Sequence, residues 1–311
     1  MLIADDTVEY IFKDGKILRA IKEYREKILC EVRKGDYVVF YNAVYPTVFM
    51  ENAIRKKMAF PVLLMADYSE PQEYKNLPRK VLAYLAKIDM GLYDRYVVLS
   101  SEFLKMISDC KPKLLLQGGV DDDILEKFRE PKCDSEVLRL YYSGYLAEET
   151  GVKMLLDAFR DIDENKVELI LSGRGPLVQM VQEQAKRDKR IKYFGYVSNE
   201  EYYELLNSSH VVINPRNMHL PQNRNNFPSK IMEYLASGRM IISTKFAGWE
   251  IFENNAIFIE SDSTSLKVAI RDCIEQYHDN AMKYYFNNQI FADNFLWKNQ
   301  STKFQEFLRK N

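Results

Sequence analysis

The sequence is short of the residues that cross-link small secreted proteins or build metal clusters. It contains only four cysteines, none close to another in the sequence, and three histidines. Scattered cysteines are typical of reduced thiols in a cytosolic protein, and without close pairs they cannot form a local zinc cluster. The four are Cys30, Cys110, Cys133 and Cys273. We therefore expect neither a disulfide scaffold nor a metal site.

Long hydrophobic runs and an excess of one charge are missing as well. No apolar segment approaches the roughly 18 residues that span a bilayer, and no signal peptide is visible. The formal net charge of -1 gives no electrostatic reason to bind nucleic acid. With 47% hydrophobic and 29% charged residues over 311 positions, the composition indicates a cytoplasmic globular protein large enough for two domains.

What the sequence does contain is a regular alternation of strand and helix patterns. Strand-like runs lie at 36–43, 60–68, 95–100, 112–119, 136–144, 166–173, 190–197, 210–215, 239–245 and 256–261. Helical patterns separate them, and Ser198 with Glu201 predicts a capping box at one helix start. Such alternation predicts parallel, doubly wound α/β sheets. We expect one domain at 1–130, joined by a carboxyl-terminal helix at about 290–311, and a second at 136–289.

Chemistry is expected at the carboxyl ends of these strands, where parallel α/β sheets bind ligands. Gly173, Arg174 and Gly175 connect a strand to a helix there. Glycines in such a turn let backbone N–H groups approach a phosphate, but a tight turn that needs glycine explains them equally well. Arg216 follows the strand at 210–215, where a guanidinium can grip phosphate oxygens in pairs; an ordinary surface arginine is the alternative.

The segment 223–238, NRNNFPSKIMEYLASG, carries the most specific pattern. Pro228 suits the first turn of a helix, whose free N–H groups then face the loop 217–226. Lys230 can supply positive charge to a diphosphate, and Glu233, on the same face, can accept two hydrogen bonds from a vicinal diol such as ribose. A surface ion pair between Lys230 and Glu233 is the alternative. The combination favours a nucleotide diphosphate site.

Together these segments resemble a known family. LYYSGYLAEETGVKMLLDAF, VELILSGRGP, IKYFGYVSNEE, VVINPR, NFPSKIMEYLASGRMIIST and AGWEIF stand in the order found in the carboxyl-terminal domain of glycosyltransferase family 4. The Phe-Pro-Ser-Lys helix start is similar to that of the bacterial capsular and exopolysaccharide type. The resemblance covers about residues 36–305 and is strongest over 137–255. It implies a GT-B fold of two doubly wound Rossmann-like domains facing a cleft, here with the amino-terminal domain shortened.

The resemblance also implies roles for residues, taken position by position. It assigns Glu233 to the ribose, Lys230 to the phosphate-facing helix start, and Gly173 with Gly175 to the loop near the donor phosphates. Tyr196 and Val197 would lie beside the base. The donor-binding and catalytic candidates are completed by Arg174, Arg216, Asn225, Phe227, Pro228 and Ser229. No metal or other cofactor is implied, because in GT-B enzymes cationic side chains and helix termini stabilise the departing diphosphate.

Several positions depart from the family pattern. The family usually places a second glutamate eight positions before the ribose glutamate, and here Asn225, which cannot carry a negative charge, stands there. Tyr145 and Thr150 occupy positions where an arginine and a lysine are common. The glycine-rich loop that normally faces the acceptor has no counterpart after Met1. Arg174, Arg216 and Lys230 are the residues that could supply the missing positive charge.

On the acceptor side the candidates are fewer. Asp67 and Tyr68 follow a first-half strand, where Asp67 serves equally well as a base, as an acceptor ligand or as the cap of the next turn. His219, in the loop 217–226, is a further candidate near the substrates. His210 and His278 are interpreted as structural or solvated.

A basic amphipathic pattern at 15–34 raises the question of membranes. Its apolar stripe and its lysines and arginines would suit the anionic inner face of a membrane, where a lipid-linked acceptor is presented. A helix packed on the first sheet is the favoured alternative. The expected location is the cytoplasm, with peripheral membrane contact through 15–34 as the variant.

The sequence thus predicts a metal-independent glycosyltransferase of the hexosyltransferase type (EC 2.4). It would move a sugar, with retention, from a nucleoside diphosphate sugar to a saccharide or lipid-linked acceptor in bacterial capsule or other surface polysaccharide biosynthesis. The alternative is a catalytically weak donor-binding partner subunit, or a truncated product of a longer transferase. The sugar, the base, the acceptor and the oligomeric state cannot be named from the sequence.

Overall fold

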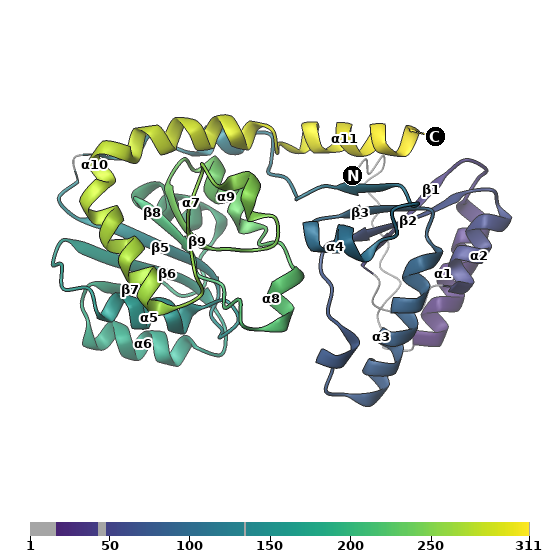
Figure 1. The fold of residues 1–311 in the computed structure, drawn as a ribbon, viewed down its shortest axis with the longest axis horizontal. Helices are drawn as coiled ribbons and strands as arrows, with labels where there is room; N and C mark the ends of the chain where they lie inside the picture. The colour runs from purple at the N-terminus through teal and green to yellow at the C-terminus, as the bar shows by residue number, and fades with distance from the viewer. Residues whose placement is uncertain (1–16, 43–47, 134, 311) are drawn as a thin grey trace. The chain divides into compact units, whose positions relative to one another are not determined.

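The structure is a computed structural model that describes residues 17–42, 48–133 and 135–310. Contacts between Cα atoms divide the chain into two units, both built on parallel sheets (Figure 1). Unit 1 comprises Met1–Gln117, Asn225–Phe227 and Ser301–Asn311, and unit 2 comprises Gly118–Arg224 and Pro228–Gln300. The division falls at Gly118, before the expected domain boundary between residues 130 and 136. The segment after Gly118 belongs to unit 2 because Val120 pairs with Leu296.

The sheet of unit 1 has four described strands in the order β1-β2-β3-β4. They are β1 (Tyr37–Tyr41), β2 (Phe60–Met65), β3 (Arg95–Val98) and β4 (Lys113–Leu115). The connecting helices are α2 (Val48–Lys56), α3 (Leu77–Asp89) and α4 (Ser101–Met106). Sequential strands are neighbours, so the described chain winds in one direction across the sheet. Right-handed crossovers that all step the same way bring their helices to the same face.

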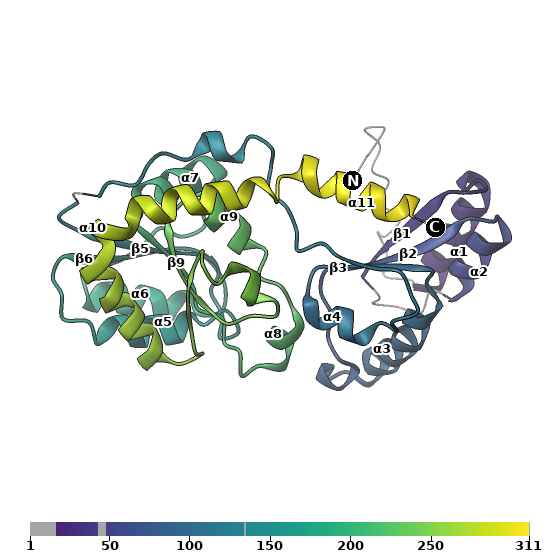
Figure 2. The ribbon, with the colours of Figure 1, turned by 45° about the horizontal axis from the view of Figure 1, so that its top comes forward.

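The two faces of this sheet are covered by different parts of the chain. Leu63 of β2 packs with Phe103 of α4 on one face, whereas Val62 and Val97 pack on the other against α11 (Trp297–Arg309). Tyr37 donates from its hydroxyl to a backbone carbonyl of α11 at 2.5 Å. The last helix of the sequence therefore supplies a layer to the unit that begins the sequence (Figures 1 and 2).

The basic segment predicted at 15–34 forms α1 (Ile17–Glu31), which lies beside α2. Most of its apolar stripe, Ile17, Ile21, Tyr24 and Ile28, lies outside the side chains that the structure describes. Among the helices described, none is long and apolar enough to cross a bilayer.

Unit 2 has a six-stranded parallel sheet in the order β10-β9-β8-β5-β6-β7. Its strands are β5 (Leu138–Tyr145), β6 (Val167–Arg174), β7 (Ile191–Tyr193), β8 (Val211–Asn214), β9 (Met240–Thr244) and β10 (Ile257–Ile259). The chain steps outward from β5 through β6 to β7, and then returns to the other side of β5 with β8. The neighbours β5 and β8 thus mark a reversal of strand order, which is where α/β sheets open a crevice for ligands.

The helices of unit 2 confirm the predicted alternation of strands and helices, with one additional short helix, α8. They are α5 (Val152–Arg160), α6 (Val178–Arg187), α7 (Asn199–Ser208), α8 (Pro221–Asn225), α9 (Lys230–Ala236) and α10 (Ser263–Asp293). The capping box at Ser198 and Glu201 is present and opens α7. The short α8 lies inside the predicted loop 217–226, and α10 continues for 31 residues, longer than any other described helix.

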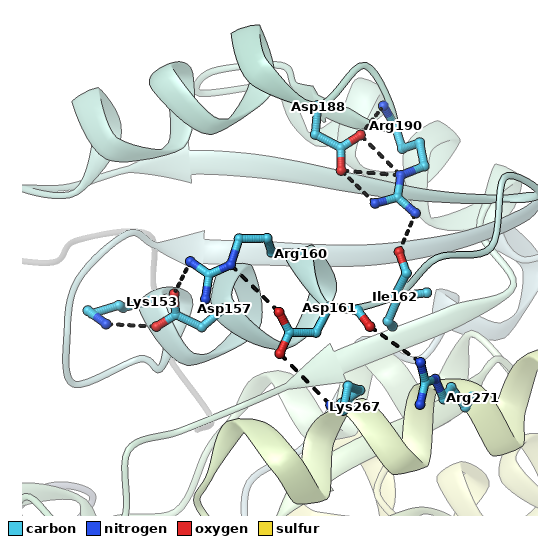
Figure 3. A network of polar contacts seen from close by, with 9 residues as sticks. All are labelled: Lys153, Asp157, Arg160, Asp161, Ile162, Asp188, Arg190, Lys267 and Arg271. Atoms are coloured by element: carbon cyan, nitrogen blue, oxygen red, sulfur yellow. Dashed lines mark hydrogen bonds and ion pairs between the residues drawn. The ribbon is translucent and has the colours of Figure 1, made fainter.

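Polar side chains join the far end of α5 to its neighbours (Figure 3). Asp161 lies 3.8 Å from Lys267 of α10 in an ion pair, and its carbonyl accepts from Arg271 at 3.4 Å. Arg190, just before β7, donates to Asp188 at 2.7 Å and to the Ile162 carbonyl at 2.6 Å. Exposed pairs of this kind contribute little each, so their main effect is to fix how α5, α10 and the α6–β7 turn meet.

Candidate functional site

A cavity of about 420 Å³ opens in unit 2 beside the reversal of strand order. Its lining residues come from the carboxyl ends of β5 and β6, from the segment after β7, and from the first turns of α7 and α9. They are Ser143, Gly144, Tyr145, Ser172, Gly173, Arg174, Tyr196, Val197, Asn199, Tyr202, Tyr203, Lys230 and Glu233. The size lies within the usual range for a small-molecule pocket.

Glycines at the ends of β5 and β6 shape the floor of this cavity. Gly144 and Gly173 are opposite each other in the register, and Gly173 has φ of +133°. A Cβ atom on Gly173 would lie 1.8 Å from the Gly144 carbonyl oxygen, so no larger residue fits without moving the backbone. Gly175, at φ +157°, packs against the backbone of Leu146 and does not line the cavity. Close packing of two strand ends therefore accounts for both glycines of the predicted turn.

Lys230 and Glu233 both line the cavity, but they do not pair with each other. The Glu233 carboxylate accepts a hydrogen bond from the Tyr202 hydroxyl at 2.7 Å. The Lys230 ammonium lies over the ring of the same tyrosine, 4.4 Å from its centre. Both groups contact Tyr202, and no ion pair joins Lys230 to Glu233 among the described residues, so the surface ion pair considered as the alternative is not seen. Burial lowers the pKa of Lys230, while the nearby Glu233 opposes that shift.

Arg174 and Tyr196, which also line the cavity, form a cation–π pair. The guanidinium carbon of Arg174 lies 5.1 Å from the centre of the Tyr196 ring. Tyr196 is 76% exposed, which leaves an aromatic face open to a planar ligand. Val197 follows it in the lining.

A second cavity of about 190 Å³ adjoins the first and shares Lys230 with it. Arg216, at the end of β8, lines this second space together with Pro228 and Ser229, which precede α9. Thr150 lines it too, and its hydroxyl donates to the Tyr145 carbonyl at 2.6 Å. Thr150, which stands where the family often has a lysine, therefore closes the β5–α5 turn.

The two cavities are rich in positive charge. Arg174, Arg216 and Lys230 line them, with Glu233 as the carboxylate on the same wall. Within the described ranges, no group of three or more His, Cys, Asp and Glu side chains is placed to hold a metal ion. Cations so arranged can attract and hold a ligand that carries phosphate groups.

The other predicted residues lie elsewhere. Asn225 and Phe227 are grouped with unit 1 by their contacts, and neither is among the residues that line the two cavities. His219 lies on a different wall of unit 2, where its ring nitrogen Nε2 is 3.1 Å from the Ser261 carbonyl. It lines two further cavities, of about 240 Å³ each, away from Lys230 and Glu233.

Asp67 and Tyr68 follow β2 in unit 1. Within the described residues the Asp67 carboxylate accepts no hydrogen bond, and the following turn is closed by Glu70, whose N–H donates to Glu73 at 3.2 Å. The capping role considered for Asp67 is therefore not seen. Tyr68 is buried, and its hydroxyl has no hydrogen-bond partner in the part of the chain described.

Sequence reasoning missed the contribution of α7. Asn199, Tyr202 and Tyr203 line the cavity from this helix. A signal was present, because a helix that follows a parallel strand begins near the carboxyl edge of the sheet, and this one carries two tyrosines in its first half. The capping box fixed the helix start but gave no reason to prefer its tyrosines as ligand contacts over core residues.

Comparison with known proteins places this geometry in a fold class. A glycosyltransferase from Rickettsia africae aligns with a TM-score of 0.74 and 17% identity, over 98% of this chain and 85% of that one. Anabaena Alr3699/HepE in complex with UDP aligns with a TM-score of 0.74 and 16% identity, over 94% and 83%. The lipopolysaccharide outer core galactosyltransferase WaaB aligns with a TM-score of 0.70 and 12% identity, over 95% and 81%. The fold is GT-B, as the sequence predicted.

At the level of sequence, residues 138–276 match the family model described as Glycosyl transferases group 1. Apart from Asn225–Phe227, the matched residues belong to unit 2, and they include Arg174, Arg216, Lys230 and Glu233. A search of curated protein sequences finds no match.

Proposed function

We propose that this chain is a glycosyltransferase that takes its sugar from a nucleoside diphosphate sugar bound in unit 2. The observation that carries the proposal is the cluster of Lys230, Tyr202 and Glu233 in the cavity beside the reversal of strand order. A carboxylate there can accept from ribose hydroxyls while the adjacent ammonium faces a diphosphate. The family match over 138–276 and the UDP and UDP-glucose named for Alr3699/HepE support the same ligand class.

The two cavities suggest how such a donor lies. The larger one, with Tyr196, Val197 and Glu233, suits the nucleoside, and the smaller one, with Arg216, suits the phosphate and sugar end. Lys230, common to both, is at the diphosphate. In the reaction an acceptor hydroxyl forms a bond to the anomeric carbon, the bond to the diphosphate oxygen breaks, and a phosphate oxygen takes the acceptor proton. Arg174, Arg216 and Lys230 offset the negative charge that develops on the diphosphate.

We propose retention at the anomeric carbon, a hexosyl donor, no metal requirement, and a saccharide or lipid-linked acceptor in bacterial surface polysaccharide synthesis. On the acceptor side, the buried Tyr68 hydroxyl without a partner among the described residues favours a ligand contact, with Asp67 beside it. Peripheral contact with the inner face of a membrane through 15–34 would bring the chain to a lipid-linked acceptor.

A second function is favoured by one observation. Asn225 stands where the family usually has a sugar-facing glutamate, and it is grouped with unit 1 rather than with the donor cavities. A chain that binds the donor without turning it over would act as the partner subunit of another transferase.

The test is binding and turnover measured together. Wild-type protein is titrated with UDP-, GDP- and ADP-sugars by calorimetry, and sugar release is followed with and without a lipid-linked acceptor and with EDTA. We expect one nucleotide to bind, Glu233→Gln to weaken it at least tenfold, and the exposed Glu183→Gln on α6 to bind like wild type. The loss reflects a charged hydrogen bond of about 1.5 to 3 kcal/mol. Release that survives EDTA supports a metal-independent enzyme, and binding without release supports the partner subunit. No binding to any nucleotide contradicts both.

A further inference from the structure

We propose that Tyr202 is a positioning residue. It holds the Glu233 carboxylate and the Lys230 ammonium, the two charged groups assigned to the donor, in place before the donor binds. This inference rests on the proposed function. Tyr202 donates from its hydroxyl to Oε2 of Glu233 at 2.7 Å, and its ring lies under the Lys230 ammonium at 4.4 Å. A single side chain thus contacts the two residues to which the donor's ribose and diphosphate are assigned.

The hydrogen bond determines what Glu233 offers to a ligand. An ionised carboxylate has two oxygens with about four acceptor positions, and Tyr202 occupies one of them on Oε2. Oε1 and the remaining position on Oε2 stay available for the two hydroxyls of a vicinal diol. Because the hydroxyl fixes the carboxylate plane before binding, a ligand need not order that side chain itself.

The ring determines where Lys230 lies. Lys230 and Glu233 are three residues apart on α9, a spacing at which opposite charges normally attract each other. Here the ammonium lies over the face of Tyr202, where the ring's negative electrostatic potential stabilises a cation. The lysine is thereby kept from neutralising the carboxylate, and both charges remain available to one ligand.

Tyr202 is itself held firmly. It is buried, and its ring centre lies 6.2 Å from that of Tyr141 and 5.3 Å from that of Tyr203. Burial, with Glu233 as a further cause, raises the pKa of Tyr202 well above its ordinary value, so the hydroxyl keeps its proton and remains a donor. The helix that carries it begins at the capping box of Ser198. Packing of this kind fixes one rotamer, which is what a positioning role requires.

The test compares ligands with and without the ribose diol. The nucleoside diphosphate among UDP, GDP and ADP that binds wild type most tightly is titrated alongside its 2′,3′-dideoxy counterpart. Tyr202→Phe removes the hydroxyl and keeps the ring. The matched control is Tyr277→Phe on α10, which removes a buried hydroxyl that has no hydrogen-bond partner in the described structure. Thermal unfolding of both variants checks that unit 2 remains folded.

For Tyr202→Phe we expect the Kd of the ribonucleotide to rise about tenfold and that of the dideoxy nucleotide to change less than twofold. Tyr277→Phe should change neither. Tyr202→Leu, which also removes the ring, should weaken both ligands, because Lys230 loses its support. Equal weakening of both ligands by Tyr202→Phe would show a merely structural role and overturn the inference, as would no change in either. Failure of wild type to bind any of the three nucleotides instead refutes the proposed function, so the two failures are distinguishable.

Discussion

The two sheets of this molecule use the same parallel pairing but differ in winding. In unit 1 the described strands follow one another from β1 to β4 without a reversal, whereas in unit 2 the chain returns past β5 to place β8 on its other side. A reversal separates the two loops that leave neighbouring strands and opens a crevice between them. The smaller cavity, lined by Asn214 and Arg216, lies between β5 and β8, and the larger cavity with Glu233 adjoins it at the ends of β5 and β6. Strand order, more than strand number, therefore marks where a ligand can bind.

The winding also explains how each sheet is covered. Unit 2 turns in both directions, so its own crossovers can cover both faces of its sheet. The one-way winding of unit 1 leaves Val62, Val97 and Leu116 on a face that Phe304 and Phe307 of α11 cover. Unit 1 thus depends on a helix from the far end of the sequence.

The largest expected effect comes from removing that helix segment. A chain ending at Gln300 exposes the face with Val62 and Val97 and loses the hydrogen bonds that Tyr37 and Arg95 make to α11. We expect unit 1 to lose cooperative folding while unit 2 stays folded. Hydrogen exchange measures this directly: amides of β1 to β4 should exchange rapidly, and those of β5 to β9 should stay protected. Protection retained in β2 and β3 would show that unit 1 does not need α11.

A smaller loss of stability is expected on replacing Arg239, which connects the ends of α7 and α9 in unit 2. Its guanidinium is fully buried and donates to backbone carbonyls of Leu206 and Asn207 at the end of α7, of Arg129, and of Ser237 after α9. Arg239→Met leaves these buried acceptors unpaired, so the free energy of unfolding of unit 2 should fall by about 3 to 5 kcal/mol. Urea unfolding checks this.

The control for Arg239 is Arg187→Met, which changes an exposed arginine at the end of α6. Its free energy of unfolding should match wild type within about 0.5 kcal/mol. A similar small change for Arg239→Met would mean that water or neighbouring groups satisfy the carbonyls, and that the guanidinium does not hold α7 and α9.

The smallest effect concerns His210, which joins β5 to β8 at the reversal itself. The backbone N–H of His210 donates to the Arg139 carbonyl at 2.9 Å, and its ring Nδ1 accepts from the backbone N–H of Arg139 at 2.8 Å. That acceptor requires a neutral ring. Burial, with the nearby charges of Arg139 and Arg239 adding to it, lowers the pKa of His210 from 6.5 to about 4.

The pKa of His210 is lower in the folded state than in the unfolded state. Its contribution to the free energy of unfolding is therefore fully present above about pH 6.5. It declines as the pH falls towards 4, by up to about 3 kcal/mol. Unfolding of unit 2 measured between pH 7 and 4 should show this decline in wild type. His210→Gln, whose amide oxygen can still accept from Arg139, should reduce it. The exposed His278→Gln removes only a minor contribution to the lowered pKa of His210 and should reduce the decline far less. If the free energy of unfolding of His210→Gln fell with pH as steeply as that of wild type, His210 would not be the cause of the decline.

Periodicity and turn residues were enough to predict the strands and most helices of both sheets. The three-residue spacing of Lys230 and Glu233 behind Pro228 was enough to predict which helix start lines the cavity. What could not be predicted depends on contacts distant in sequence: Tyr202 meets Glu233 across 31 residues, and α11 meets the first sheet across more than two hundred. The roles of Gly173 and Gly175 were likewise undecided, because the backbone oxygens they must avoid belong to Gly144 and Leu146, at and just after the end of β5.

The most direct test of the central claim is to locate the donor by hydrogen exchange on the full chain. Amide exchange is compared with and without the nucleoside diphosphate sugar that binds best. The account predicts slower exchange at the ends of β5 and β6, in the first turn of α7 and around Lys230, with no change in β1 to β4. Protection confined to the strand ends of unit 1, or to the wall with His219 and Ser261, would contradict it.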